Sequence, residues 1–464
     1  MTPNNKPTEA SRRSVMTVLI TGVLMGALDI SIVGPALPSI ERTLWMDPLF
    51  LSWIFSVYVL ASLAGIPLMS RLSDVFGRRN IYVTAVGIFG LGSLVVSLTD
   101  NYVILLIGRG IQGFGVSGIL PVASAVIGDI YPPEKRGRML GLIGAVFGVA
   151  FIIGPVLAGT VLHFFRWNAL FFINVPISFI LILVSLRTLP SKAIATADDI
   201  DIRGIITLTA GLIFITLGIS NLKPDHFFHS LTDPITLIWF TSAVLSITLL
   251  VAIERQEPFP VVKLEFLFNK QVRLVGLMAF GLGLFQASFV FVPQLIIFLF
   301  RVDESTAGFM LIPVITGSAI AAPLAGQITD WKGSRVVILA GLIIAATGLL
   351  LTGTLPHEKW LIYLAGALIG IGFSMRSSLN YIMLSEADRR DRASAQGLLT
   401  IFISLGQLTG ASMIGAIAAA PSRTGGGFGM AFTLCGIIAI GLAVAALFLK
   451  GQAAELKTAR ENDA

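Results

Sequence analysis

Long apolar runs follow one another along almost the whole chain, and this feature constrains the fold more than any other. A helix that crosses a bilayer needs about 20 mostly apolar residues, because in hydrocarbon its backbone polar groups must pair within the helix. The sequence therefore predicts an all-α membrane protein with fourteen transmembrane helices. They are expected near residues 15–37, 50–70, 81–98, 102–128, 138–162, 169–187, 204–221, 235–253, 274–300, 306–329, 336–355, 361–384, 393–420 and 429–449.

The composition agrees with lipid as the main solvent. Only 12% of the residues are charged, whereas about 25% is usual in soluble domains. The net charge of +6 does not indicate a nucleic-acid partner, because the basic residues are scattered through short loops. The single cysteine, Cys435, excludes a disulfide within the chain.

The distribution of basic residues predicts the orientation in the membrane. Of the 32 Lys and Arg residues, 24 fall on the side of the two termini, six fall in the opposite loops, and Arg109 and Arg376 fall within spans. Basic residues are enriched in cytoplasmic loops, so both termini are expected to be cytoplasmic. The polar head, 1–14, precedes a run too long for a signal-peptide core, and we expect that run to be the first permanent helix.

An internal repeat appears when the chain is laid over itself at an offset of 256 residues. The repeat predicts two six-helix halves separated by two extra spans, an arrangement found in transporters with parallel repeats. The expected parts are a cytoplasmic tail, 1–14; an N-terminal six-helix bundle, 15–190; a linker with the seventh and eighth spans, 191–272; a C-terminal six-helix bundle, 273–450; and a second cytoplasmic tail, 451–464.

Two short cytoplasmic loops carry the clearest repeated motif. Residues 70–80, SRLSDVFGRRN, align with residues 326–335, GQITDWKGSR. Glycine permits a tight turn, and an aspartate facing a helix N-terminus stabilises it by about 0.3–1 kcal/mol. A solvated charged turn would explain one such loop, but not two in register. Both loops resemble the signature loop of the major facilitator superfamily, and the resemblance implies a conformational-switch role for Asp74, Gly77, Arg78, Arg79, Asp330, Gly333 and Arg335.

The fifth span has the glycine-rich sequence GLIGAVFGVAFIIGPVLAG over 141–159. Glycines at helical spacing allow another helix to approach closely, and a proline inside the span removes a hydrogen bond and is expected to bend the helix. The pattern resembles the antiporter motif of exporters within this superfamily, although a glycine face alone is also explained by packing. The motif residues are Gly144, Gly148, Gly154, Pro155 and Gly159.

Two charges deep in the spans point to proton coupling. Asp29 shares a helix face with small residues, and burial favours a neutral carboxyl that can bind and release a proton. The alternative is a static ion pair with Arg109 or Arg376. Arg109 lies in GRGIQGFGVSG, 108–118, which resembles a basic motif linked to proton transfer in the family; a bond to a free backbone carbonyl is its alternative role.

Residues 28–40 and 166–177 resemble the fourteen-helix drug:proton antiporter branch. That resemblance implies a proton-coupled antiporter that exports small lipophilic compounds by alternating access. The absence of an N-x-[ST] sequon and the very short outer loops favour a bacterial cytoplasmic membrane. The proton gradient would replace a cofactor, and the sequence has no GK[ST] phosphate loop. A lipid transporter or an uncoupled facilitator of the same fold stays open, as does partnership with a periplasmic adaptor and an outer-membrane channel. A channel and a membrane enzyme are disfavoured, and no metal site is expected.

Arg376 leaves the spans with two positive charges against one negative charge. The cargo is therefore expected to be neutral or anionic, unless Arg376 belongs to a gating ion pair. Polar and aromatic residues in the fourth, ninth and twelfth spans are candidates for the substrate cavity: Gln112, Phe285, Gln286, Phe289, Asn380 and Tyr381, together with Arg376.

Overall fold

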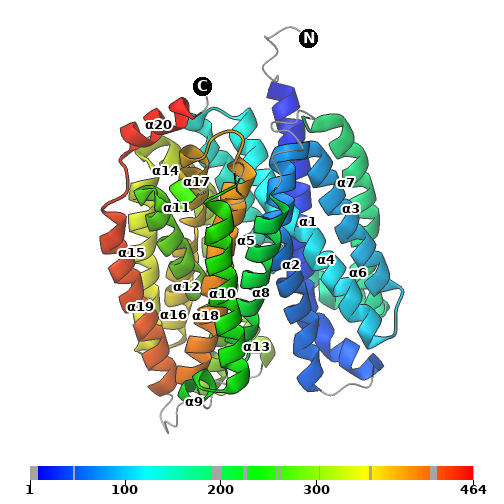
Figure 1. Cartoon of the computed structure of the whole chain (residues 1–464). Helices are drawn as coiled ribbons and strands as arrows, with labels where there is room; N and C mark the ends of the chain where they lie inside the picture. The colour runs from blue at the N-terminus through cyan, green and yellow to red at the C-terminus, as the bar shows by residue number, and fades with distance from the viewer. Residues whose placement is uncertain are drawn as a thin grey trace. The chain divides into compact units, whose positions relative to one another are not determined.

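The structure, a computed structural model, consists of α-helices throughout the part of the chain that it describes (Figure 1). The described residues are 9–44, 48–190, 201–222, 227–257, 260, 264–302, 304–354, 358–418 and 426–462.

Fourteen membrane-spanning segments lie in these residues, as the hydropathy pattern predicts. Eleven are single helices, and the sixth, tenth and twelfth spans are each built from two helices in sequence. In chain order the helices are α1 (Glu9–Leu44), α2 (Pro48–Phe76), α3 (Arg78–Ser97), α4 (Tyr102–Ile130), α5 (Pro133–Phe164), α6 (Asn168–Phe172) with α7 (Asn174–Thr188), α8 (Ile202–Ser220), α10 (Pro234–Glu254), α12 (Lys270–Phe300), α13 (Glu304–Phe309) with α14 (Ile312–Lys332), α15 (Ser334–Gly353), α16 (Lys359–Phe373) with α17 (Arg376–Glu386), α18 (Arg392–Ala418) and α19 (Gly426–Ala446).

Three further helices are too short to span a membrane: α9 (Phe227–Leu231), α11 (Leu264–Phe268) and α20 (Gln452–Glu461).

Local capping explains where several spans begin. The Asn101 side chain accepts hydrogen bonds from the first-turn amides of α4, and Asp201 does the same for α8. Asp233 caps α10, which also has a proline at its first position, where the missing N–H has no cost. Asn269 caps α12. These short polar side chains satisfy amides that have no partner within the helix, so the helices start where the apolar runs start.

The chain divides into two compact units. Unit 1 comprises 1–132, 150–200 and 389–397, and unit 2 comprises 133–149, 201–388 and 398–464. The first half of α5 thus belongs to unit 2, and the first turns of α18 belong to unit 1. The two six-helix bundles that the repeat predicts have different boundaries, and they stay a prediction.

Each unit contains an equivalent close contact between two helices. In unit 1, Gly113 of α4 packs against the backbone carbonyl of Tyr58 on α2. In unit 2, Gly370 of α16 packs against the carbonyl of Val314 on α14. These pairs are related by offsets of 257 and 256 residues, so the sequence repeat corresponds to repeated packing. A side chain at either glycine would separate the two helices.

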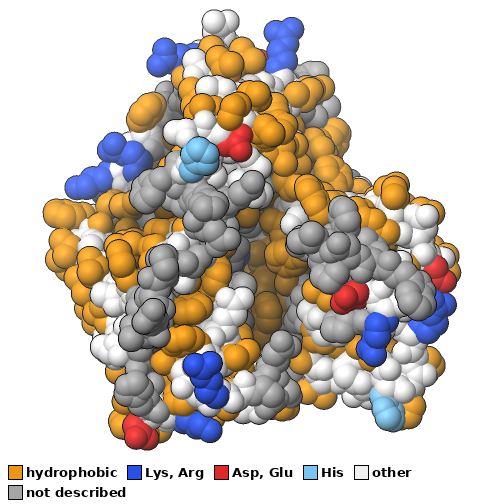
Figure 2. Space-filling view, turned by 90° about the horizontal axis from the view of Figure 1, so that it is seen from below, with side chains coloured by type: hydrophobic (Ala, Val, Ile, Leu, Met, Phe, Trp, Pro, Cys, Tyr) orange, Lys and Arg blue, Asp and Glu red, His pale blue; other side chains and the backbone are white. Residues whose placement is uncertain are grey.

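Large hydrophobic side chains are common on the outer surface. Ile238, Val244 and Leu245 of α10 are exposed, as are Phe179 and Ile180 of α7. Figure 2 shows hydrophobic side chains spread over the face that it presents, with charged side chains few and scattered. Such a surface is stable against lipid but not against water, which agrees with the membrane-spanning lengths of the helices.

Candidate functional site

A buried ion pair forms the polar centre of unit 1. Arg109 Nη1 of α4 donates to Asp29 Oδ2 of α1 over 2.6 Å, and both side chains are fully buried. The other carboxylate oxygen, Oδ1, accepts from Gln112 Nε2 at 3.1 Å and from Asn174 Nδ2 at 3.1 Å. Two helices, α4 and α7, therefore supply the carboxylate of α1 with three donors. Both carboxylate oxygens therefore have hydrogen-bond donors in place of water.

Arg109 makes further contacts through Nε, Nη1 and the face of the guanidinium, while its buried Nη2 has no hydrogen-bond partner among the described residues. Its Nε donates to the Ile54 carbonyl at 3.1 Å, and its Nη1 also donates to Gln112 Oε1 at 2.9 Å. The guanidinium lies 4.3 Å from the centre of the Tyr58 ring and 5.7 Å from that of Phe171. Both alternatives that the sequence left open, the pair with Asp29 and a bond to a backbone carbonyl, are present together.

Sequence reasoning missed Asn174, Tyr58 and Ser93 in this centre. Asn174 lies at the start of α7, and Ser93 Oγ accepts from Gln112 Nε2 at 2.7 Å. An amide in the apolar run FFINVPI was the only sequence signal for Asn174. Single polar residues in spans are too common for that signal to identify a site without the fold.

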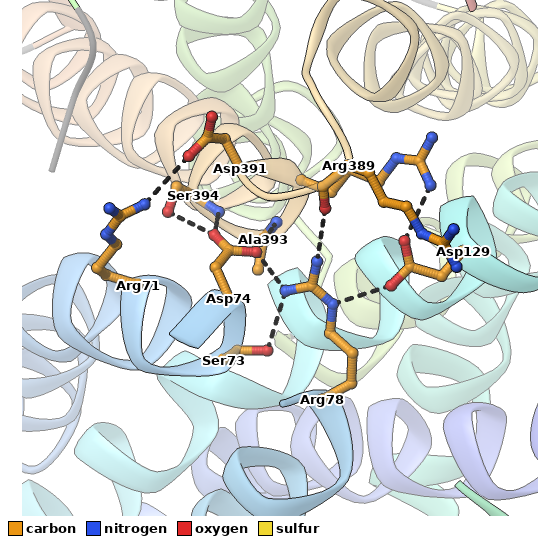
Figure 3. A network of polar contacts seen from close by, with 10 residues as sticks. Arg71, Ser73, Asp74, Arg78, Asp129, Arg389, Asp391, Ala393 and Ser394 are labelled. Atoms are coloured by element: carbon orange, nitrogen blue, oxygen red, sulfur yellow. Dashed lines mark hydrogen bonds and ion pairs between the residues drawn. The ribbon is translucent and has the colours of Figure 1, made fainter. Parts of the chain in front are cut away.

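The first signature loop holds the start of α18 through Asp74. Asp74 Oδ1 accepts from the Ala393 amide at 3.1 Å, while Oδ2 accepts from the Ser394 amide at 3.0 Å and from Ser394 Oγ at 2.7 Å (Figure 3). A carboxylate in this position caps the helix and complements the positive end of its dipole.

Arginines surround the Asp74 cap. Arg78 pairs with Asp74, and its Nε donates to Asp129 Oδ2 at 3.0 Å (Figure 3). Arg392 Nη1 donates to Asp129 Oδ1 at 2.9 Å, and Arg71 Nη1 donates to Asp391 at 3.1 Å. The network joins the C-terminal ends of α2 and α4 to the N-terminal ends of α3 and α18 within unit 1.

Arg79 lies outside this network. Its side chain donates to the Leu186 carbonyl at 3.2 Å, near the end of α7.

The second signature loop makes the equivalent contact in unit 2, although it bonds the second turn of α5 rather than its first. Asp330 Oδ1 accepts from the Gly137 amide at 2.7 Å, and Oδ2 accepts from the Arg138 amide at 2.8 Å, both in α5. Gly137 and Arg138 are the repeat counterparts of Ala393 and Ser394. The turn glycines Gly77 and Gly333 have φ values of 92° and 86°, where an L side chain is strained. The repeated sequence thus corresponds to a repeated contact.

The two signature loops differ at the position that Arg78 occupies in the first loop. The counterpart in the second loop is Ser334, whose amide donates to Glu455 Oε2 of α20 at 3.0 Å. Arg335 follows on α15 and is partly exposed.

The glycines of the antiporter-type motif on α5 face different partners. Gly144 and Gly148 lie against Ala322 and Ala319 of α14 in unit 2. Gly154 packs against Ser31 of α1 in unit 1, and Ser31 Oγ donates to the Ala150 carbonyl at 3.1 Å. Gly159 has open space beside it, and α5 continues through Pro155.

The candidate cavity residues of unit 2 differ in accessibility. Phe285, Asn380 and Tyr381 are buried, whereas Gln286 and Arg376 are partly exposed. Gln286 Oε1 accepts from Gln407 Nε2 at 2.9 Å, and the Arg376 guanidinium lies 5.4 Å from the centre of the Phe147 ring. The side chain of Phe289 lies outside the described part of the structure.

Unit 2 has no counterpart of the Asp29–Arg109 pair among its described residues. The repeat positions of Tyr58, Arg109 and Gln112 are Val314, Gly366 and Ile369, at offsets of 256 or 257. These three residues line a small apolar pocket. The buried charge network is therefore a feature of one half of the repeat. The described residues also contain no cluster of His, Cys, Asp and Glu that could hold a metal ion.

The fourteen spans, the repeated packing and the two capped loops define a multi-pass membrane protein of the transporter class. The chain belongs to the Major Facilitator Superfamily, whose sequence profile matches residues 19–300 and 274–464. This membership confirms the predicted family, and its members are transporters rather than enzymes. The family also implies a small-molecule cargo.

Curated bacterial relatives are similar over most of the chain. The uncharacterized MFS-type transporter YfiU of Bacillus subtilis is 31% identical, covering 86% of this chain and 78% of the relative. Multidrug resistance protein 3 of the same organism is 28% identical, covering 88% of this chain and 80% of the relative.

Among solved structures, the human organic anion transporter MFSD10 has a TM-score of 0.70 at 16% sequence identity, covering 94% of this chain and 99% of that protein. At this identity the similarity shows the fold alone.

Proposed function

We propose that the chain is a proton-coupled antiporter that exports small lipophilic compounds across the cytoplasmic membrane by alternating access. The observation that carries the proposal is the Asp29 carboxylate, which lies deep in a span and is paired with Arg109. A buried ionisable residue in a membrane protein is expensive and usually belongs to an ion or proton pathway.

Proton binding would break the ion pair. A proton on Asp29 removes the charge that holds Arg109, so the guanidinium must take its remaining partners, Gln112 and the Ile54 carbonyl. The two protonation states thus favour two arrangements of α1 and α4, which is the coupling that an antiporter requires.

The proton gradient supplies enough free energy for export. One elementary charge crossing the membrane releases about 2.3 kcal/mol per 100 mV, which corresponds to about a fifty-fold gradient of a neutral cargo.

The Asp74 and Asp330 caps are the proposed conformational switch. Asp74 holds the first turn of α18 and Asp330 holds the second turn of α5, each by two backbone amides, so each contact is either made or lost as a unit. The glycine faces of α5 would let that helix move against its small-residue neighbours during the transition.

The relatives support export and location. Multidrug resistance protein 3 and the multidrug transporter MdtP of Bacillus subtilis are each 28% identical to this chain. Their bacterial origin supports placement in a cytoplasmic membrane. The basic-residue distribution supports both termini inside.

Dye accumulation in everted membrane vesicles tests the proposal. Energised vesicles that contain the native chain are expected to accumulate at least one dye from a panel of cationic, neutral and anionic lipophiles. A protonophore or the Asp29→Asn substitution should abolish accumulation, whereas Asp29→Glu should retain part of it. Asp100→Asn is the matched control, because Asp100 pairs with Arg166 on the surface. Uptake that survives the protonophore would identify an uncoupled facilitator instead.

A further inference from the structure

Arg376 is a cation deep in the twelfth span. It lies near the middle of the segment Lys359–Glu386, at the first residue of α17, and its side chain is partly exposed. Within the part of the chain that the structure describes, its only specific contact is the face of the Phe147 ring at 5.4 Å. An arginine at this depth is costly unless an anion or a polar partner compensates its charge.

Arg109, unlike Arg376, has a carboxylate partner among the described residues. Arg109 has a carboxylate at 2.6 Å and a backbone carbonyl at 3.1 Å, so unit 1 balances its deep charge internally. The repeat counterpart of Arg376 is the buried Ile119, at an offset of 257. The repeated fold therefore does not need a cation at this position, and Arg376 is an addition specific to unit 2.

The backbone beside Arg376 is interrupted. The amides of Ser374, Met375 and Ser377 each bond to the carbonyl three residues earlier, so a tight turn separates α16 from α17. A short stretch of this kind within a longer helix often marks a functional hinge. The guanidinium is thus placed where the span can adjust, beside an aromatic ring.

We propose that Arg376 is the anion-binding residue of the transport site and that the cargo is a lipophilic carboxylate. The inference rests on the proposed transport function and specifies its substrate class. A planar carboxylate matches the guanidinium in a bidentate geometry, and the Phe147 ring offers an apolar surface to the rest of the cargo. An organic cation would be repelled by Arg376, and a neutral cargo would leave the arginine without a counter-charge.

The proposal has a consequence for the driving force. Export of a monoanion carries negative charge out of the cell, and entry of a proton carries positive charge in. Both steps therefore move net positive charge inward. The membrane potential then assists export more strongly than it does for a neutral cargo.

Binding in detergent tests the inference without depending on proton coupling. The probes are 2-naphthoate, its amide 2-naphthamide and the cation 2-naphthylmethylammonium, which share one ring system and differ in charge. Calorimetry of the native chain is expected to show at least about tenfold tighter binding of the carboxylate than of the amide. Arg376→Gln should remove that preference, and Arg376→Lys should retain part of it.

Lys457→Gln is the matched control, because it removes one positive charge from the exposed face of α20. No carboxylate binding, equal affinity for the three probes, or an unchanged preference in Arg376→Gln would overturn the inference. None of these results tests proton coupling, which the vesicle experiment measures separately. Loss of coupling with the carboxylate preference intact would overturn the antiport mechanism alone.

Discussion

At the residue scale, the account depends on how a few charges are paired. Asp29 and Arg109 could be found from sequence, because a charge stands out within an apolar run. Their pairing could not, since α1 and α4 are far apart in the chain and Arg376 was an equally good partner. Tyr58 and Asn174, which complete the site, have no comparable sequence signal. Physical reasoning on sequence therefore identified the charged residues but not the geometry around them.

Removing one partner of the buried pair should destabilise the protein more than removing both. Asp29→Asn leaves the Arg109 charge buried without compensation, at an expected cost of about 3–5 kcal/mol. The double variant Asp29→Asn/Arg109→Gln removes both charges, so its apparent melting temperature in detergent should fall by less than that of Asp29→Asn alone. Strictly additive shifts would contradict a direct ion pair.

Gly333→Ala should destabilise the second signature loop. Gly333 has a φ of 86°, and an added Cβ would meet the backbone of Gln452. We expect a loss of about 1–2 kcal/mol from backbone strain, with further loss where α20 is displaced. Gly441→Ala is the control, because Gly441 lies in a helix with open space beside it, so alanine should be neutral or stabilising there. Equal melting temperatures for the two variants would refute the steric argument.

At the element scale, α20 was not predicted from sequence, because it is short and has few apolar residues. In the structure it packs on the second signature loop and on α5. Glu455 accepts from the Ser334 amide, Gln452 Nε2 donates to the Asp330 carbonyl at 3.1 Å, and Arg460 pairs with Glu134 at 2.7 Å. The helix thus contacts the loop that carries the Asp330 cap.

Docking of α20 should depend on pH through Glu455. Burial raises the pKa of this carboxyl to about 7; the Ser334 hydrogen bonds lower it, Glu386 raises it and Lys450 lowers it. Tyr381 and Arg136 are also charged or titratable groups close to this site. Because the folded-state pKa lies above the ordinary value, the stabilisation is complete below about pH 4.5 and is lost as the pH rises through about 7.

Hydrogen exchange of the α20 amides checks this expectation. Exchange should be faster at pH 8 than at pH 6 after correction for intrinsic rates. Glu455→Gln should show little pH dependence, while Glu461→Gln, on the exposed face of α20, should behave like the native chain. A native helix equally protected at both pH values would argue against Glu455 as the titrating group.

At the scale of the whole molecule, the fold was predictable because hydrocarbon leaves few choices. All fourteen predicted spans are present in the described residues, with shifts of a few residues at their ends. The division into compact units was not predictable, because the start of α5 and the start of α18 each pack in a different unit from the rest of their helix. The contacts of Asp74 with α18 and of Asp330 with α5 each lie within one of these units.

The two caps should contribute unequally to the transport cycle. Asp74 bonds three donors of α18 and pairs with Arg78, whereas Asp330 bonds two amides of α5. Asp74→Asn is therefore expected to slow export more than Asp330→Asn, while cargo affinity in detergent changes little in either variant. Vesicle export rates and calorimetry measure the two quantities. Unchanged export in both variants would remove the loops from the proposed switch.

The most direct test of the central claim is a substrate-triggered pH change in proteoliposomes that hold a pH-sensitive dye. Addition of a transported lipophile is expected to move protons in the opposite direction to the cargo in the native chain, and Asp29→Asn should abolish the signal although the protein stays folded. Cargo movement with no accompanying change of pH would contradict proton antiport and leave an uncoupled facilitator of the same fold.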